Sequence, residues 1–333
     1  MSDLVPLGKT KVTVSALGVG SNTWGAGNKN YGGSGGPDEE VKALDTCLAN
    51  GINFFDTAEM YGMGASEVSL GVAAKGKDVR IATKFLPWWP TKPFRTSGSL
   101  PKALKQSLGR LGRERIELYQ VHFPVFWMSI PKLMDRMAQA VDYGEIRAVG
   151  VSNYSEAQMR LAHRVLAEKG IPLASNQVQY SLLHRDPEQD GVLAACRELG
   201  ITLIAYMPLA SGALTGKYSK DNLPADSRRR NKLPQFRKKN MERVESLVSL
   251  LRDIGEDHER SPTQVALRWL MQQEAVLPIP GIKNSTQAKE VAGALTFTLN
   301  ADEVEELSEE SIDKSKETTA AEAKRLEADE QPE

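Results

Sequence analysis

Residues 53–71 read NFFDTAEMYGMGASEVSLG, an apolar run that ends on a carboxylate and is followed by a turn and a helix-like segment. The apolar run predicts a buried strand, and the segment that begins at Ala65 predicts a helix. Asp56 therefore stands at the exit of a strand, with Tyr61 in the turn that follows. Enzymes built on a barrel of parallel strands keep their chemistry at such exits, so these two side chains are the first candidates for an active site.

A short apolar run followed by a helical segment recurs along most of the chain. We expect eight strands, at residues 16–19, 52–55, 79–82, 116–121, 146–151, 177–180, 202–206 and 276–279. We expect helices at residues 38–50, 66–75, 99–111, 131–143, 155–169, 189–199, 241–257, 262–273 and 286–294. Strict alternation of strand and helix requires a parallel sheet with right-handed crossovers. Eight such units predict a (β/α)8 TIM barrel, and a β-hairpin at residues 5–14 would cap one end of it.

The barrel would occupy residues 1–312 as one domain. Residues 313–333 are rich in Glu, Lys, Ala and Thr, which predicts a polar tail that is helical or disordered. Two inserted segments depart from the regular spacing. Residues 86–98 combine prolines and aromatic residues, which suits a rigid aromatic wall, and residues 219–239 carry two basic clusters, which suits a loop on the face with the chemistry.

The composition restricts the class of partner. The 333 residues carry a formal net charge of -1, so the chain has no global field to attract nucleic acid or an anionic membrane. No apolar run reaches the length of a membrane span, and the first residues lack the pattern of a signal peptide. We expect a cytoplasmic protein, a monomer or weak homo-oligomer, that acts on small molecules. The plastid stroma, after removal of a targeting segment, is the alternative location.

The cysteines and histidines indicate neither a disulfide framework nor a metal site. Cys47 and Cys196 lie far apart in helix-like segments and predict buried free thiols. No spacing of Cys, His, Asp or Glu matches a metal-ligand pattern. The sequence therefore predicts chemistry without a metal.

Two further polar residues stand at strand exits. Lys84 follows the third expected strand and His122 follows the fourth. In a closed barrel these exits meet Asp56 and Tyr61 at one mouth. A tyrosine hydroxyl has a pKa of about 10 in water, so it is a poor acid at neutral pH unless a neighbouring cation favours its anion. Lys84, paired with Asp56, would supply that cation.

Six motifs share one family pattern, and the similarity covers roughly residues 7–307. They are Asp56-Thr57-Ala58-x-x-Tyr61-Gly62-x-Gly64-x-Ser66-Glu67-x-x-Leu70-Gly71, Thr83-Lys84, Leu118-Tyr119-Gln120-x-His122-x-Pro124, Gly144-x-Ile146-Arg147-x-Val149-Gly150-Val151-Ser152-Asn153, Asn176-Gln177-Val178-x-Tyr180 and Ala205-Tyr206-x-Pro208-Leu209-Ala210-x-Gly212-x-Leu214-Thr215-Gly216-Lys217-Tyr218. As a set they resemble the aldo-keto reductase family. The resemblance implies hydride transfer from a nicotinamide cofactor to an aldehyde or ketone. Tyr61 would be the general acid, Lys84 and Asp56 would tune it, and His122 would orient the carbonyl by a hydrogen bond.

The resemblance also implies a cofactor site along the later strand exits. The nicotinamide would be held by Ser152, Asn153 and Gln177, with Tyr206 stacked on the ring. The pyrophosphate would meet Pro208, Leu209, Gly212, Leu214 and Lys217, and the adenosine end would meet Gly281, Lys283, Gln287 and Glu290. Lys283 would neutralise a 2′-phosphate, which favours NADP(H) over NAD.

Aromatic and sulfur side chains gather near the same exits. We expect several to line a substrate pocket: Trp24, Met60, Trp88, Phe123 and Trp127. Ordinary packing is the alternative for each. Within the family, the chain looks closest to microbial and plant-plastid members, some of them pyridoxal reductases, so pyridoxal is one candidate substrate. A role as a redox-sensing partner subunit, similar to potassium channel β-subunits, is the alternative to carbonyl reduction.

Overall fold

The computed structural model describes residues 4–25, 35–88, 94–225 and 231–312. The expected polar tail at 313–333, the arginine cluster at 228–230 and residues 89–93 of the expected aromatic segment lie outside these residues. No helix in the described part of the chain is long and apolar enough to cross a bilayer.

Eight parallel strands form the centre of the molecule, and their order in the sheet is their order in the sequence. They are β3 (Gly18–Gly20), β4 (Phe54–Asp56), β5 (Arg80–Phe85), β6 (Ile116–Val121), β7 (Ile146–Ser152), β8 (Leu173–Gln179), β9 (Thr202–Tyr206) and β10 (Val276–Ile279). Gly20 N–H donates to the Pro280 carbonyl at 2.9 Å and Gly20 bridges Gly281, which joins the two edges of the sheet. A Cβ at Gly18 would lie 2.9 Å from Ile279, so only glycine permits this close approach of the edges. The predicted eight-stranded barrel is confirmed.

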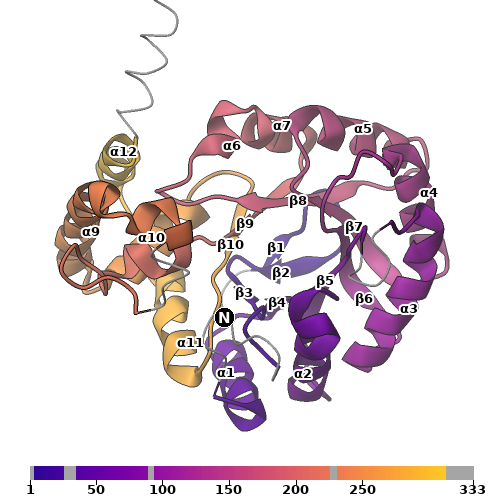
Figure 1. Ribbon diagram of the computed structural model, residues 1–333, viewed down its shortest axis with the longest axis horizontal. Helices are drawn as coiled ribbons and strands as arrows, with labels where there is room; N and C mark the ends of the chain where they lie inside the picture. Colours follow the sequence, from indigo (N-terminus) through magenta and orange to yellow (C-terminus); the bar gives the residue numbers. More distant parts are fainter. Residues whose placement is uncertain (1–3, 26–34, 89–93, 226–230, 313–333) are drawn as a thin grey trace, which may run out of the picture.

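Helices surround the strands (Figure 1). They are α1 (Pro37–Ala49), α2 (Ala65–Ala73), α3 (Leu100–Leu111), α4 (Ile130–Asp142), α5 (Glu156–Ala167), α6 (Asp186–Gln189), α7 (Val192–Leu199), α9 (Lys238–His258), α10 (Pro262–Met271), α11 (Ser285–Ala292) and α12 (Ala301–Glu310). The helix expected at 189–199 begins at Val192 as α7, because Gly191 before it adopts a left-handed φ of 82°. Residue 189 instead ends the short helix α6. Helix α12 was not predicted.

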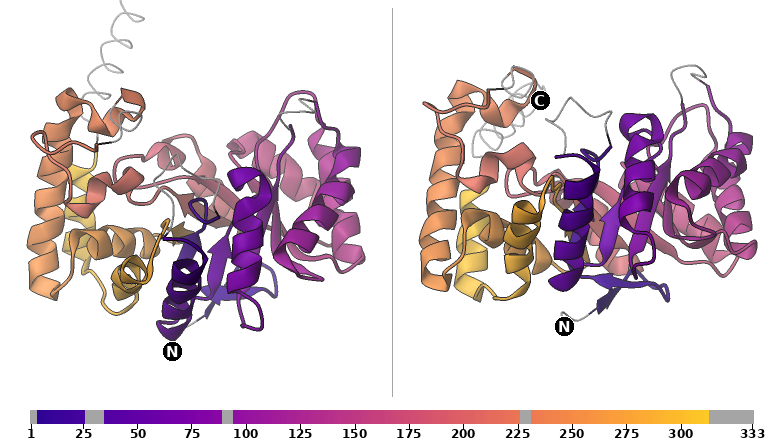
Figure 2. Two further views of the ribbon diagram at one scale, coloured as in Figure 1. Left: turned by 60° about the horizontal axis from the view of Figure 1, so that its bottom comes forward. Right: turned by 90° about the horizontal axis from the view of Figure 1, so that it is seen from below.

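The N-terminal hairpin closes one end of the barrel, as predicted. Strands β1 (Leu4–Pro6) and β2 (Thr13–Ser15) pair antiparallel, and Figure 2 shows them beneath the parallel strands. Leu7, Val12 and Val14 pack against apolar side chains from inside the barrel, such as Leu118 and Ile204. This apolar plug leaves the opposite end of the barrel, where the strands exit, for polar residues.

Two strand boundaries differ from expectation in a way that matters for the site. The third parallel strand, β5, continues to Phe85, so Lys84 lies within the strand and not after it. Strand β8 begins at Leu173 and not at residue 177. The polar run Ser175-Asn176-Gln177 does not have the apolar pattern of a buried strand, so the sequence did not predict this part of β8. The extension places Gln177 inside a strand, facing its neighbours across the barrel.

Candidate active site

Asp56 and Lys84 form a buried ion pair at the barrel mouth. Asp56 is the last residue of β4, and Lys84 lies on the neighbouring strand β5. Lys84 is fully buried, and its Nζ donates to Asp56 Oδ2 at 2.5 Å and to the Thr57 carbonyl at 2.8 Å. Burial lowers the pKa of the Lys84 ammonium below its usual value, and the Asp56 carboxylate opposes that shift. A buried ammonium needs such a partner to keep its charge.

Tyr61 places its hydroxyl next to this pair. The turn η2 (Tyr61–Gly64) follows β4, and Lys84 Nζ donates to the Tyr61 hydroxyl at 3.5 Å. Gly62 and Met63 in this turn have left-handed φ angles of 59°. Left-handed conformations in residues other than glycine are uncommon and cluster at functional sites. The structure therefore brings the phenol and the cation together as the sequence predicted.

His122 completes the predicted group of four. It follows β6 directly, stacks on Phe123 with 4.6 Å between ring centroids, and meets Tyr61 edge-on at 5.8 Å. Burial, and then the Lys84 charge, hold the pKa of the imidazole well below its usual value of 6.5, so the ring is neutral at pH 7. Its Nδ1 is buried and has no hydrogen-bond partner among the described residues. A neutral imidazole carries one N–H, which can donate to a carbonyl oxygen.

The other oxygen of Asp56 accepts from two glutamine amides. Gln177 Nε2 donates to Asp56 Oδ1 at 2.8 Å, and Gln120 Nε2 donates to the same oxygen at 3.4 Å. Sequence reasoning gave Gln120 no function and assigned Gln177 only to the cofactor. Leu118, two residues before Gln120, packs inside the barrel. Because alternate residues of a barrel strand face the interior, this spacing was the available signal that Gln120 also faces inward.

The residues predicted to hold the nicotinamide lie together beside the four. Ser152 Oγ donates to the Gln177 carbonyl at 2.9 Å, and Tyr206 OH donates to Asn153 Oδ1 at 3.0 Å. Asn153 Nδ2 donates to the His122 carbonyl and to Ser152 Oγ, each at 3.0 Å. Both N–H groups of the Asn153 amide are therefore used within the protein.

The segment after β9 forms a turn with three successive left-handed residues. Ala210 and Ser211 have φ angles of 48° and 59°, and Gly212 follows at 93°. Within the turn, the Ala210 N–H donates to the Met207 carbonyl and the Gly212 N–H donates to the Leu209 carbonyl, each at 2.9 Å. Five residues predicted to meet the pyrophosphate lie in or beside this turn: Pro208, Leu209, Gly212, Leu214 and Lys217. Leu214 is fully buried in the core, whereas Lys217 is exposed and lies over the Tyr218 ring at 5.6 Å.

The predicted adenosine end lies at the start of α11. Lys283 N–H donates to Gln287 Oε1 at 2.9 Å, and Gly281 is exposed. Glu290 is instead tied to α10, because Ser261 Oγ donates to its carboxylate and Gln264 Nε2 donates to its carbonyl at 2.9 Å. A carboxylate that sequence reasoning missed also reaches this end: Glu39 of α1 accepts from Ser285 N–H and Oγ, each at 3.0 Å.

The five residues predicted to line a substrate pocket lie in different surroundings. Trp88 packs on Phe123 at 5.2 Å, and Phe123 in turn stacks on His122, so these rings continue outward from the site. Trp127 is 37% exposed, and Met60 is half-buried. Trp24 is fully buried in the core, and its Nε1 donates to the Ile282 carbonyl at 2.9 Å, so no exposed surface supports its assignment to a pocket wall.

A second buried ion pair, also missed, joins Glu59 to Arg95 beside Leu86. Glu59 Oε1 accepts from Leu86 N–H at 2.6 Å and from Arg95 Nη1 at 2.7 Å. Arg95 Nη1 also donates to the Leu86 carbonyl at 2.8 Å, and its guanidinium lies 4.5 Å from the Phe85 ring centroid. Burial raises the pKa of the Glu59 carboxyl, and Arg95 opposes that shift.

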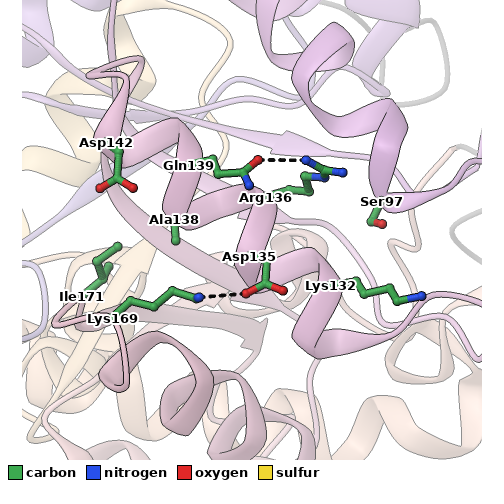
Figure 3. A pocket seen from close by; sticks show the side chains of 9 residues that line it. All are labelled: Ser97, Lys132, Asp135, Arg136, Ala138, Gln139, Asp142, Lys169 and Ile171. Carbon is green, nitrogen blue, oxygen red and sulfur yellow. Dashed lines mark hydrogen bonds and ion pairs between the residues drawn. The ribbon is translucent and has the colours of Figure 1, made fainter.

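A hollow of about 800 Å³ lies on the outside of the barrel, against α4. Figure 3 shows the charged side chains that line it. Lys169 pairs with Asp135 at 3.0 Å, and Arg136 donates to Gln139 at 2.9 Å, so these side chains satisfy one another. None of the four predicted catalytic residues lines this hollow. Within the described residues no group of His, Cys, Asp or Glu is placed to bind a metal.

Comparison with known proteins gives a consistent result. Residues 16–312 match the Aldo/keto reductase family. The chloroplastic pyridoxal reductase of Arabidopsis thaliana is 36% identical over 313 residues, which cover 88% of this chain and 82% of that protein. An aldo-keto reductase of Schizosaccharomyces pombe, named for NADP(+), is 36% identical over 313 residues, 89% of this chain and 88% of that protein. The solved structure of a glycerol dehydrogenase from Gluconobacter oxydans superposes with a TM-score of 0.81 at 28% identity, covering 92% of this chain and 94% of that one.

Proposed function

The chain belongs to the aldo/keto reductase family, and we propose that it reduces aldehydes or ketones to alcohols with NADPH and with Tyr61 as the proton donor. The observation that carries the proposal is the Tyr61 hydroxyl 3.5 Å from a fully buried lysine ammonium, beside a neutral histidine ring.

The residues at the mouth fit a nicotinamide dinucleotide. Ser152, Asn153, Gln177 and Tyr206 converge beside Asp56 and His122, and the turn at Ala210–Thr215, where the pyrophosphate would bind, follows Tyr206 along the chain. When bound, the reduced nicotinamide supplies the hydride that the carbonyl carbon receives. Support for NADPH comes from Lys283 at the predicted adenosine end and from the fission-yeast relative, which is named for NADP(+).

The protein's own part in the reaction is the proton and its control. The Tyr61 hydroxyl donates its proton to the carbonyl oxygen, and the alcohol forms when carbon has gained a hydride and oxygen a proton. Lys84 stabilises the phenolate left behind, because a cation within hydrogen-bond distance favours the anion of the phenol. Asp56 keeps Lys84 charged, and the neutral His122 donates an N–H to the carbonyl oxygen and orients it.

The substrate class follows from the wall of the pocket. Phe123 and Trp88 extend the His122 ring into a continuous aromatic surface, which suits flat carbonyl compounds. Pyridoxal is one such aldehyde, and the similarity to a plant pyridoxal reductase supports it as a candidate.

The test is single-turnover oxidation of bound NADPH by pyridoxal and by a panel of other aldehydes. Tyr61→Phe should reduce the rate about 10²- to 10⁴-fold, the usual contribution of a general acid, with NADPH affinity unchanged in a fluorescence titration. Tyr143→Phe is the matched control, because Tyr143 is 77% exposed on the outside of the barrel and should leave the rate unchanged. Full turnover in Tyr61→Phe would overturn the proposal and would favour a nucleotide-binding role without catalysis.

A further inference from the structure

The Asp56 carboxylate is almost completely enclosed by groups of the chain itself. It is 2% exposed, so water supplies little of its solvation. Lys84 serves Oδ2, while Gln177 and Gln120 serve Oδ1. A buried carboxylate stays ionised only when such donors replace its hydration. The two amides are therefore the remaining support for the negative charge once Lys84 has been counted.

Gln120 is held in an orientation that presents its N–H groups to Asp56. Its side chain is fully buried, and its Oε1 accepts from Ser175 Oγ on β8 at 3.3 Å. A carboxylate can only accept, so the nitrogen end of the amide faces Asp56 and the oxygen end faces the serine hydroxyl. Space for this arrangement depends on Gly150 of β7, where a Cβ would lie 2.4 Å from Ser175 Oγ and 2.9 Å from Gln120 Cγ.

Gln177 connects the same carboxylate to the cofactor side of the mouth. Its backbone carbonyl accepts from Ser152 Oγ and from Asn153 N–H, each at 2.9 Å. Its side-chain nitrogen is committed to Asp56 at 2.8 Å. Only the amide oxygen of Gln177 is therefore left to accept a hydrogen bond from a bound carboxamide.

We propose that Gln120 and Gln177 are positioning residues that hold the Asp56 carboxylate aligned on Lys84, and through it hold the ammonium in place beside Tyr61. The inference rests on the proposed role of Tyr61 as proton donor. Gln120 would support only the group formed by Asp56, Lys84 and Tyr61, whereas Gln177 would support this group and also contact the cofactor.

The charges around Lys84 explain why this support matters. Asp56, Tyr61 and His122 contact or face it at the mouth, and Glu67 of α2 adds a favourable charge from behind the strand. Burial pushes Lys84 toward the neutral amine. When an amide donor is removed, the Asp56 carboxylate is held less firmly, and so is the Lys84 ammonium that it contacts. Tyr61 then loses the cation that makes it an acid.

The decisive variant is Gln120→Met, which keeps the length of the side chain and removes the N–H groups. A hydrogen bond to a charged group is typically equivalent to about one pKa unit or more. We expect kcat to fall about tenfold at neutral pH. We also expect the alkaline limb of the kcat profile, where activity is lost as the proton donor deprotonates, to move to higher pH by up to about one unit, because a cation that is held less firmly favours the phenolate less. The Kd for NADPH should not change, whereas Gln177→Met should both shift the profile and weaken NADPH binding.

Ser175→Ala is the milder second variant, because it frees the Gln120 amide to rotate and leaves the N–H groups in place. It should shift the profile in the same direction by a smaller amount. Wild-type profiles in both Gln120→Met and Ser175→Ala would overturn the inference. If Tyr61→Phe abolishes turnover while these profiles stay unchanged, only the inference fails. If Tyr61→Phe retains turnover, the proposed function itself fails.

Discussion

Replacing Arg95 by Met should expose the energetic role of the ion pair behind the aromatic wall. The side chains of Arg95 and Glu59 are 10% and 3% exposed. Met keeps most of the apolar stem that lies against Phe85 and removes the guanidinium. Glu59 then retains the hydrogen bond from the Leu86 N–H at 2.6 Å, but it loses the charge that balances its own. The variant leaves a buried carboxylate without a cation.

The expected destabilisation is about 3–5 kcal/mol at pH 7, the usual effect of removing one partner from a buried pair. For a chain of this size, about 2 °C of Tm corresponds to each kcal/mol, so Tm should fall by about 6–10 °C. The effect should depend on pH. Burial raises the pKa of Glu59 in the folded protein above its value of 4.5 in the unfolded chain, and loss of Arg95 raises it further. The folded variant therefore binds more protons than the unfolded chain at any pH between 4.5 and the raised pKa of the folded state. Its stability falls as the pH rises through this range.

Urea unfolding of the wild type and of Arg95→Met between pH 5 and pH 8 measures this difference. The gap between them should be smaller at pH 5 than at pH 8, because a carboxyl with a raised pKa is protonated more fully at the lower pH. The double variant Glu59→Gln, Arg95→Met is the control, because an amide has no charge to balance, and it should recover stability at pH 8. A gap that is constant across this range, or a double variant no more stable than the single one, would refute this account of the pair.

Two other predictions concern the cofactor and the thiols. Lys283→Ala should weaken NADPH binding more than NADH binding in parallel titrations, because only NADPH carries the 2′-phosphate that the ammonium would neutralise; equal losses would contradict the role given to Lys283. Burial raises the pKa of the Cys47 and Cys196 thiols to about 12, so a thiol reagent at pH 8 should modify neither in the folded protein and both after denaturation, and rapid labelling of native protein would contradict their buried state.

The sequence was sufficient for the barrel and for the four catalytic candidates. Each of Asp56, Tyr61, Lys84 and His122 lies at or next to the carboxyl end of a strand, and the parallel topology alone brings such ends together. Their meeting did not depend on the error in β5, because Lys84 faces the interior one residue before that strand ends. The prediction survived because it rested on topology, which tolerates an error of one or two residues.

Pairings between side chains from distant strands were out of reach. Gln120 donates to a residue 64 positions away and Gln177 to the same residue across 121 positions, and both contacts depend on register and side-chain rotamer. Arg95 follows a proline-rich segment without periodicity, so nothing indicated that it turns inward to Glu59.

Helix α12 is a different case. Its capping box was readable, since Asn300 and Glu303 bond each other's backbone N–H at 2.7 and 2.9 Å.

The barrel interior is divided between two kinds of layer, and this division explains where the chemistry lies. At the hairpin end the interior is apolar, with residues such as Phe54, Leu118 and Ile204 packed against Leu7. At the mouth the corresponding interior positions carry Asp56, Lys84 and the two glutamines, all buried. Apolar side chains at these positions would often be neutral or stabilising, because desolvation of a buried ion pair offsets much of its Coulomb attraction. Stability therefore does not account for the polar layer, whereas the proposed proton donor, which needs a permanent neighbouring cation, does.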